Sequence, residues 1–393
     1  MRDAPQWGIV LTCDLLVIGA GAFGAWTALE MRRAGKSVRL VDAWGPAHAR
    51  ASSGGESRII RMGYGADEIY TRMAVRSLAR WREILHSAGE PLFHRTGVLW
   101  LARAGDPYSE ATRATLDAAG VRSEILPFAE MAVRYPQMRL ADTRIFGILE
   151  PESGALMARR AIAFLVRELV RRGGTYQTAA VEPPAGRGRL AGVRTSDGET
   201  ISAGDYVFAC GAWLPKVFPG ILQNRIHPTR QEVFFFAPPR GDRQFSPAHL
   251  PVWIDFADPR APYGFPDLEG RGCKVGFDRH GPAYDPDSQD RRVSDRGAEE
   301  ARSFLDALFP AMRDAPLTET RVCQYENTSN GDFLIDRHPD WENVWLAAGG
   351  SGHGFKHGPA VAEHLRARIL EGAAAEPRFA LAGKIEARQR TVH

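Results

Sequence analysis

The sequence is poor in cysteine, in long apolar runs and in excess charge of either sign. Its four cysteines, Cys13, Cys210, Cys273 and Cys323, lie far apart and form no C-x-x-C pair, so neither a disulfide framework nor a metal site is predicted. No apolar run approaches the ~20 residues that a membrane helix needs. A net charge of +3 is too small to indicate a nucleic-acid or anionic-membrane partner.

The N-terminal residues and the composition are typical of an ordinary globular protein. The N-terminus shows no separate apolar segment followed by a cleavage site, so the cytoplasm is the expected location. Of the residues, 44% are hydrophobic and 25% are charged, as in soluble globular proteins. A chain of 393 residues is too long for one ordinary core, which predicts two closely connected domains.

A glycine turn near the start of the chain is the most informative local pattern. Residues 14–18 form a short apolar run, and Gly19, Gly21 and Gly24 follow it in the spacing G-x-G-x-x-G. In a dinucleotide site the first glycine permits the tight turn and the second lets the backbone approach a pyrophosphate. The third lets helix and strand pack closely. The pyrophosphate then lies against the unpaired N–H groups at the start of the next helix.

The residues after the turn complete this pattern. A helix is predicted over residues 25–33 and a second strand over 37–42, which ends in an acid, Asp42. A carboxylate about 20 residues after the glycines can accept hydrogen bonds from an adenosine ribose, and it would repel a 2′-phosphate. The motif alone does not distinguish FAD from NAD.

A long loop rich in glycine and serine follows Asp42 and carries Arg58 and Arg61. If residues 58–61 are extended, the two arginines point to opposite faces. One could then face a cofactor and the other a substrate, although two solvent-exposed arginines fit the pattern equally well.

The predicted secondary structure changes along the middle of the chain, from alternating helices and strands to a β-rich segment. Helices are predicted over residues 67–88, 156–172 and 298–309, two more between 108 and 135, and strands over 96–101, 175–181, 190–195 and 206–210. Residues 225–280 are rich in β-type residues and proline, with candidate strands at 233–236 and 273–277. This segment is predicted to supply the sheet of the second domain.

A second glycine-rich turn near the end of the chain favours FAD. A buried-type strand over 343–348 meets Gly-Gly-Ser-Gly-His-Gly-Phe-Lys, and a helix over 357–371 follows. A NAD-binding domain is normally complete within one contiguous half of a chain. Glycine turns in both the opening and the closing segments indicate a flavoprotein instead, in which the dipole of the late helix can be directed at the isoalloxazine ring. We therefore predict an α/β protein with a Rossmann-type FAD-binding domain and an interleaved β-rich (α+β) substrate domain. The predicted boundaries are 1–90, 150–222 and 318–393 for the first domain, and 91–149 and 223–317 for the second.

The whole chain resembles the monomeric sarcosine oxidase family of FAD-dependent amine oxidases, which includes N-methyltryptophan oxidase and pipecolate oxidase and is related to D-amino-acid oxidase. The resemblance is carried by the first glycine turn with its strands, and by the segments SRIIR, TGVLWL, EPESGAL, CGAW, YGFP, CKVGF, VCQYENT and GGSGHGFKHGPAVAEHL. It implies oxidation of the C–N bond of an amino acid or N-alkyl amino acid to an imine, while O2 is reduced to hydrogen peroxide.

The resemblance also implies how FAD is held. Cys323 matches the cysteine that this family joins to the flavin through an 8α-thioether, which is the attachment we expect; the alternative is a cysteine buried in a strand. Arg58 matches an arginine packed against the flavin. The cofactor-binding positions that follow from the motif and the resemblance are Gly19, Gly21, Ala22, Phe23, Gly24, Asp42, Ser53, Arg58, Gly211, Trp213, Cys323, Gly352, Gly354, Phe355 and Lys356.

Five positions match residues that act on substrate or O2 in this family. Lys274 matches a lysine near flavin N5, where an ammonium would stabilise superoxide. Arg61 and Lys356 match the pair that holds the substrate carboxylate, for which arginine offers a bidentate fork. Tyr263 and Tyr325 match aromatic positions that line the substrate cavity.

The sequence departs from sarcosine oxidase at two places. Asp278 stands where that enzyme has a histidine shortly after the lysine, and Ser53 and Gly54 stand where it has a pair of histidines. An extra carboxylate near the pocket could receive a cationic group of the substrate, or it could face away. These changes put sarcosine itself in doubt.

Three other functions stay open at this point. A dehydrogenase could use the same site with an acceptor other than O2, and a non-catalytic flavoprotein subunit could keep the fold. A NAD-dependent enzyme is the weaker third alternative. The sequence does not settle the oligomeric state, for which a monomer is favoured.

Overall fold

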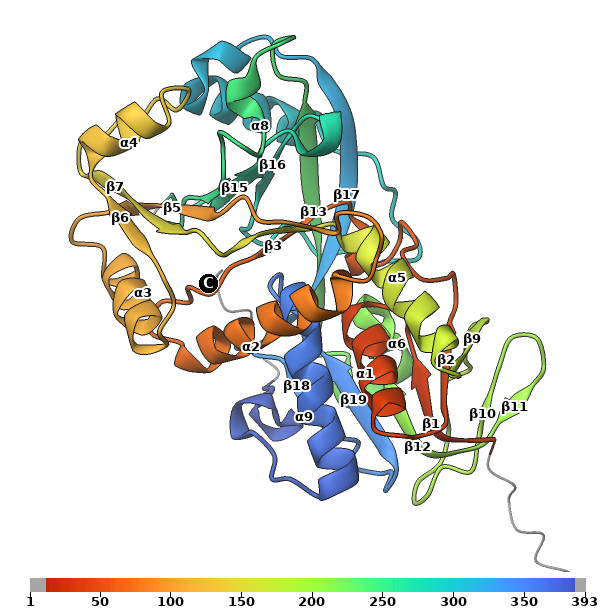
Figure 1. Cartoon of the computed structure of the whole chain (residues 1–393). Coiled ribbons are helices and arrows are strands. Elements are labelled where there is room, and N and C mark those ends of the chain that lie inside the picture. Colours follow the sequence, from red (N-terminus) through yellow and green to blue (C-terminus); the bar gives the residue numbers. More distant parts are fainter. Residues whose placement is uncertain (1–11, 257, 386–393) are drawn as a thin grey trace, which may run out of the picture. The chain divides into compact units, whose positions relative to one another are not determined.

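The computed structural model describes residues 12–256 and 258–385 (Figure 1). The expectation about the N-terminal segment concerns residues 1–11, outside the described residues. The chain divides into two compact units. The first contains the described residues of segments 1–54, 162–227 and 326–389, and the second contains segments 55–161 and 228–325.

The first unit is built on a six-stranded sheet. Its order is β18 (Leu334–Arg337), β19 (Val344–Ala348), β12 (Ala203–Phe208), β1 (Cys13–Ile18), β2 (Val38–Asp42) and β9 (Thr175–Thr178). Neighbouring strands from β19 to β9 are parallel, and β18 is antiparallel to β19. Strands β1 and β19 are buried along almost their whole length, which explains their nearly continuous apolar sequences.

Helices cover this parallel sheet. Helix α1 (Ala22–Arg33) and helix α9 (Gly358–Glu371) lie side by side although they are more than 300 residues apart in sequence (Figure 1). Helix α5 (Ala158–Arg171) begins in the second unit and continues into the first. The remaining elements of this unit are β10 (Val193–Arg194), β11 (Thr200–Ile201), α6 (Leu214–Val217) and α7 (Pro219–Leu222).

The second unit is organised by an eight-stranded sheet. Its order is β17 (Leu317–Thr328), β13 (Ile226–Phe236), β16 (Cys273–Phe277), β15 (Pro262–Phe265), β14 (Val252–Ile254), β5 (Val98–Arg103), β7 (Ile145–Glu150) and β6 (Glu124–Leu126). A smaller sheet has the order β3 (Arg58–Ile60), β8 (Gly154–Leu156) and β4 (Phe93–His94). The helices are α2 (Glu68–Leu85), α3 (Pro107–Ala118), α4 (Phe128–Arg134) and α8 (Asp295–Leu308). Phe234, Trp253, Val275 and Leu305 belong to the core that α8 shares with the large sheet.

The predicted fold class is confirmed, and the local differences have tertiary causes. The helix predicted over 156–172 begins at Ala158, because Gly154–Leu156 pairs with β3 as strand β8. The connection predicted between two helices contains strand β6, which pairs with β7. The division into units differs from the predicted one. Residues 55–90 and 150–161 lie in the second unit, where β3 pairs with β8. Residues 318–325 also lie in the second unit, and residues 223–227 lie in the first.

Among the described residues, no helix combines the length and the apolar character needed to cross a bilayer.

Candidate functional site

The first candidate site lies at one edge of the parallel sheet. Strands β1, β2, β12 and β19 run in the same direction, so the residues that follow them meet at their carboxyl ends. Gly19 follows β1, Asp42 ends β2, Gly211 comes shortly after β12 and Gly349 follows β19. Open α/β sheets bind ligands at this edge.

The glycines of the first turn are needed for close packing. A Cβ on Gly24 would lie 1.8 Å from the Gly19 carbonyl oxygen. Gly19 has φ +106°, and a Cβ there would lie 2.3 Å from the Ala209 carbonyl oxygen. A Cβ on Gly21 would lie 3.5 Å from the Ser53 hydroxyl oxygen, which is an ordinary contact distance. The space in front of helix α1 is therefore left open, as a pyrophosphate requires.

Polar groups around this turn are arranged for an anion and a ribose. The Ser53 hydroxyl accepts a hydrogen bond from the Ala22 N–H at 3.0 Å and keeps its own proton to donate. Asp42 accepts hydrogen bonds from the N–H groups of Ala20, Trp44 and Gly45 at 2.7 to 2.9 Å. Because a carboxylate has about four acceptor sites, Asp42 can still accept a hydrogen bond from a ribose hydroxyl.

The late glycine turn packs against the first one. A Cβ on Gly354 would lie 3.0 Å from the Phe23 ring, and Phe23 also packs edge-on against Phe333 at 5.4 Å. Phe23 is therefore a packing residue whose side chain holds the two turns together. Gly352 has φ +83°, and the buried Lys356 donates a hydrogen bond to the His353 carbonyl at 3.0 Å.

The segment after β12 adds an aromatic surface to the same unit. Gly211 has φ +55°, and the Trp213 ring lies 4.8 Å from the Trp44 ring. The residues of this unit fit FAD: an open helix N-terminus lies at β1, a ribose acceptor at β2, and glycine turns follow β12 and β19.

The second unit brings Arg58 and Cys323 together. The Arg58 Nη2 atom donates a hydrogen bond to the Cys323 sulfur at 3.2 Å, across 265 residues of sequence. Burial by itself lowers the pKa of Arg58, but Cys323 and the nearby Tyr263 and Tyr325 outweigh it and raise that pKa. Cys323 is half-buried, unlike the buried Cys13 and Cys273. A cation that donates to sulfur favours a nucleophilic cysteine.

Lys274 is enclosed beside this pair. Its side chain is 3% exposed, its Nζ atom donates to the Ser57 carbonyl at 2.9 Å, and it lies over the Phe265 ring at 4.5 Å. Burial, and after it the positive charge of Arg58, holds the pKa of Lys274 well below its ordinary value. Lys274 therefore loses its positive charge more easily than an exposed lysine does.

Arg61 is a buried cation among aromatic rings. It is 4% exposed, and its guanidinium carbon lies 4.3 Å from the Tyr64 ring, 4.8 Å from Trp100 and 5.3 Å from Phe256. It also donates to the Gly63 carbonyl. Within the described part of the chain, no carboxylate forms an ion pair with Arg61. Arg58 and Arg61 thus reach different surroundings, as an extended segment predicts.

Two tyrosines and Asp278 form a polar group in the same unit. The Tyr325 hydroxyl donates to Asp278 Oδ1 at 2.6 Å. Burial, and after it the negative charge of Asp278, holds the pKa of Tyr325 well above its ordinary value. Burial also raises the pKa of Tyr263, and the positive charge of Arg58 opposes that shift. Both phenols therefore stay protonated at neutral pH. Lys356 lies in the first unit and Arg61 in the second, so their pairing stays a prediction.

Sequence reasoning missed Glu150, which positions the residues after Arg61. Glu150 is fully buried, and its carboxylate accepts hydrogen bonds from the N–H groups of Met62 and Gly63, from Trp100 Nε1 and from the Ser153 hydroxyl. An acid that ends a buried strand, in the segment Glu-Pro-Glu-Ser-Gly, was the available signal. It also missed Glu326, an acid next to Tyr325.

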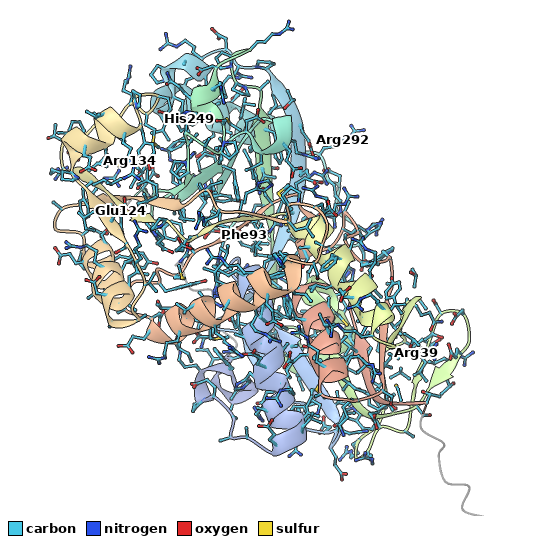
Figure 2. The ribbon with its side chains drawn as sticks, viewed as in Figure 1. Arg39, Phe93, Glu124, Arg134, His249 and Arg292 are labelled. Carbon is cyan, nitrogen blue, oxygen red and sulfur yellow. The ribbon has the colours of Figure 1, made fainter. Side chains whose placement is uncertain are left out.

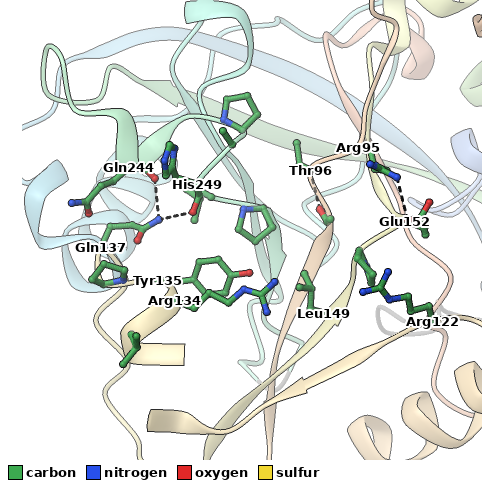
Figure 3. Close-up of a pocket in the computed structure, with 18 residues that line it drawn as sticks. Arg95, Thr96, Arg122, Arg134, Tyr135, Gln137, Leu149, Glu152, Gln244 and His249 are labelled. Carbon is green, nitrogen blue, oxygen red and sulfur yellow. Dashed lines mark hydrogen bonds and ion pairs between the residues drawn. The ribbon is translucent and has the colours of Figure 1, made fainter. Parts of the chain in front are cut away.

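The groove in Figure 3 lies elsewhere in the second unit. It has a volume of about 660 Å³ and is lined by Arg95, Arg122, Arg134 and His249, among others. Its arginines are already paired. Arg95 pairs with Glu152 (Figure 3), and Arg122 and Arg134 both pair with Glu124; Figure 2 labels Arg134 and Glu124. Paired and largely exposed arginines offer little to an anionic substrate, so this groove is not the candidate substrate site.

Comparison with known proteins agrees with this geometry. Residues 14–368 match the model of a family described as FAD dependent oxidoreductase. Monomeric sarcosine oxidase from Bacillus sp. (strain NS-129) is 32% identical over 90% of this chain and 91% of its own. Peroxisomal sarcosine oxidase from Homo sapiens is 30% identical over 90% of both chains. The crystal structure of L-proline dehydrogenase from P. horikoshii has the same fold, with a TM-score of 0.83, 20% identity, and coverage of 94% of this chain and 97% of that one.

Proposed function

This chain belongs to the family of FAD-dependent oxidoreductases that includes the sarcosine oxidases, and we propose that it oxidises the C–N bond of an amino acid or N-alkyl amino acid to an imine, with O2 as electron acceptor and hydrogen peroxide as product. The observation that carries the proposal is Arg61. A buried cation is normally paired with an acid, and this one is surrounded by rings and a carbonyl. A substrate carboxylate would supply the missing partner.

Arg61 is held in place for this role. Glu150 binds the N–H groups of Met62 and Gly63, which fixes the backbone that follows the arginine. The guanidinium offers a planar pair of donors to a carboxylate, and Tyr64 and Trp100 exclude water around it. Holding the substrate in one orientation can lower the barrier by several kcal/mol.

FAD would be held by the glycine turns and Asp42 of the first unit, and it would supply a two-electron acceptor for the hydride that leaves the carbon next to the nitrogen, with the electrons passed on to O2. The amine must lose its proton before oxidation. We propose that Tyr263 and Tyr325 form the aromatic walls beside it. No side chain is proposed as a general base.

Asp278 is proposed to select substrates that carry a second cationic group. Its carboxylate is bound by Tyr325, and replacing Asp278 with asparagine keeps a hydrogen-bond acceptor but removes the charge. We expect kcat/KM for amino acids with cationic side chains to fall about tenfold, as for loss of a charge-assisted contact. For neutral amino acids, kcat/KM should change less than about threefold, by the same estimate. An equal effect on both groups would show that Asp278 faces away from the substrate.

Cys323 is proposed to carry the flavin covalently, because Arg58 donates to its sulfur. In the Cys323→Ala variant, acid precipitation should release all of the flavin into the supernatant, whereas the wild-type pellet should stay yellow. Cys210→Ala is the matched control, since Cys210 is also half-buried but, among the described residues, its thiol donates only to the Ile18 carbonyl. A yellow Cys323→Ala pellet, or colourless wild-type pellet, would contradict the thioether.

The reaction itself is tested by anaerobic bleaching of the visible flavin absorbance. The panel is sarcosine, proline, pipecolate, and N-methyl and primary amino acids of both hands. Bleaching by one subset supports amino-acid oxidation and identifies the substrate class. A yellow protein that none of them bleaches would favour a non-catalytic flavoprotein subunit.

One observation favours a second candidate function. The lowered pKa of Lys274 disfavours the charge that activates O2, so a dehydrogenase with another acceptor is the alternative. Rapid substrate bleaching followed by slow recovery of colour in air would support it.

A further inference from the structure

Glu326 is a partly buried acid of the first unit, placed between the turn that follows β12 and the glycine turn that follows β19. Its Oε1 atom accepts a hydrogen bond from the Gly350 N–H at 3.2 Å. A Cβ on Gly211 would lie 3.9 Å from its Oε2 atom. That Oε2 atom is buried and accepts no hydrogen bond from the described residues.

This position is unfavourable for an acid in the absence of a ligand. Burial raises the pKa of Glu326 to about 7, although the N–H groups of Gly350 and Gly349 oppose the shift. No cation of the described chain pairs with it. An ionised carboxylate lacks donors of its own and needs them from its surroundings, so Oε2 requires a hydrogen-bond donor that the described residues do not supply.

The order of the strands indicates which part of FAD lies there. Along the carboxyl edge of the sheet the order is β19, β12, β1 and β2. Asp42 at β2 receives the adenosine and the Gly21 turn at β1 receives the pyrophosphate. Neighbouring strands are about 4.8 Å apart, so a cofactor that lies along this edge would carry the chain between pyrophosphate and flavin past β12 and β19, beside Glu326.

We propose that Glu326 accepts a hydrogen bond from a hydroxyl group of the FAD ribityl chain. The ribityl chain is the part of the cofactor next to the pyrophosphate, and its hydroxyl groups are donors that suit a carboxylate oxygen. The contact would stabilise the ionised form of Glu326 and would make FAD binding depend on pH.

The test measures FAD affinity by flavin fluorescence in the full-length Cys323→Ala variant, in which the proposed thioether cannot form. At about pH 8, adding Glu326→Gln should weaken FAD binding about tenfold, since it removes a charge-assisted hydrogen bond. FAD analogues that each lack one ribityl hydroxyl complete a double-mutant cycle. One analogue should bind to the parent protein about tenfold more weakly than FAD does. The same analogue should bind to the Glu326→Gln variant as tightly as FAD does.

The pH dependence gives a second readout. Because FAD binds the ionised carboxylate, affinity in the parent protein should be constant above about pH 7 and fall by about tenfold in total as the pH is lowered through that value. Glu326→Gln should abolish this dependence. Asp205→Asn is the matched control, because burial also raises the pKa of Asp205, but Asp205 lies near the amino end of β12 and accepts from Trp345 Nε1.

The outcomes are distinguishable. The proposal would be overturned if the parent protein and the Glu326→Gln variant bind FAD with equal affinity at every pH. It would also be overturned if Asp205→Asn loses as much FAD affinity as Glu326→Gln does. A Glu326→Gln penalty that persists with every deoxyribityl analogue would overturn it as well. If the parent protein binds no FAD at all, the assignment of the FAD site in the first unit fails with it.

Discussion

Replacing Lys274 with methionine is expected to slow the reaction of the reduced enzyme with O2 by about a hundredfold or more, while reduction by the substrate changes only a few-fold. Methionine keeps the length of the side chain and removes the charge that would stabilise an anion formed from O2. The measurement is stopped-flow recovery of the visible absorbance after anaerobic reduction and mixing with O2.

The pH dependence of this step follows from the lowered pKa of Lys274. The charged form is present below that pKa and is lost as the pH rises through it, so reaction with O2 should slow with rising pH in the wild type. The Lys274→Met variant should lose this dependence.

Lys384→Met is the control for removing a buried lysine. Burial lowers the pKa of Lys384 to about 8, but this side chain donates to the Arg378 carbonyl and to Asn330 Oδ1 in the first unit. If Lys274→Met reacts with O2 as fast as the wild type does, the lysine has no role in the oxidase mechanism.

Replacing Arg61 with methionine is expected to lower kcat/KM for the best amino-acid substrate by about a hundredfold or more, because a bidentate, water-excluded ion pair is lost. The corresponding amine without a carboxylate should be oxidised equally slowly by both proteins. Steady-state kinetics with the acid and the amine measure this difference directly.

Stability separates this role from a structural one. A buried cation without an acidic partner destabilises a fold, so Arg61→Met should unfold at the same temperature as the wild type or higher. Arg103→Met is the control, because Arg103 already pairs with Asp255 at 2.7 Å and should lose stability without losing the preference for the acid. An Arg61→Met protein that keeps its preference for the acid would refute the assignment.

The first glycine turn could be predicted because its information is local. The strand, the three glycines, the helix and Asp42 lie within 30 residues of one another, and each residue type is required by backbone geometry or by close packing. Strand β19 and helix α9 were predictable for the same reason. Strands β6 and β8 were missed because each has three residues and is defined by its partners β7 and β3, not by its own pattern.

The candidate site was predictable only in part. Arg61 could be assigned through the resemblance, but the sequence did not show that its guanidinium lies among three rings without an acid. The role of Glu150 was also hidden, since its hydrogen-bond partners are up to 88 residues away. Phe23 was predicted to bind the cofactor, and only the packing against Gly354 and Phe333 gives its side chain a structural role.

The sequence by itself determined the family, the fold class and the dinucleotide turn, because these depend on short segments whose geometry their own residues dictate. Only the tertiary structure decided the electrostatic state of the site. The contact of Arg58 with Cys323 spans 265 residues, and the altered pKa values of Lys274 and Glu326 result from burial. Burial and long-range contacts arise when distant segments pack together, so no local pattern in the sequence specifies them.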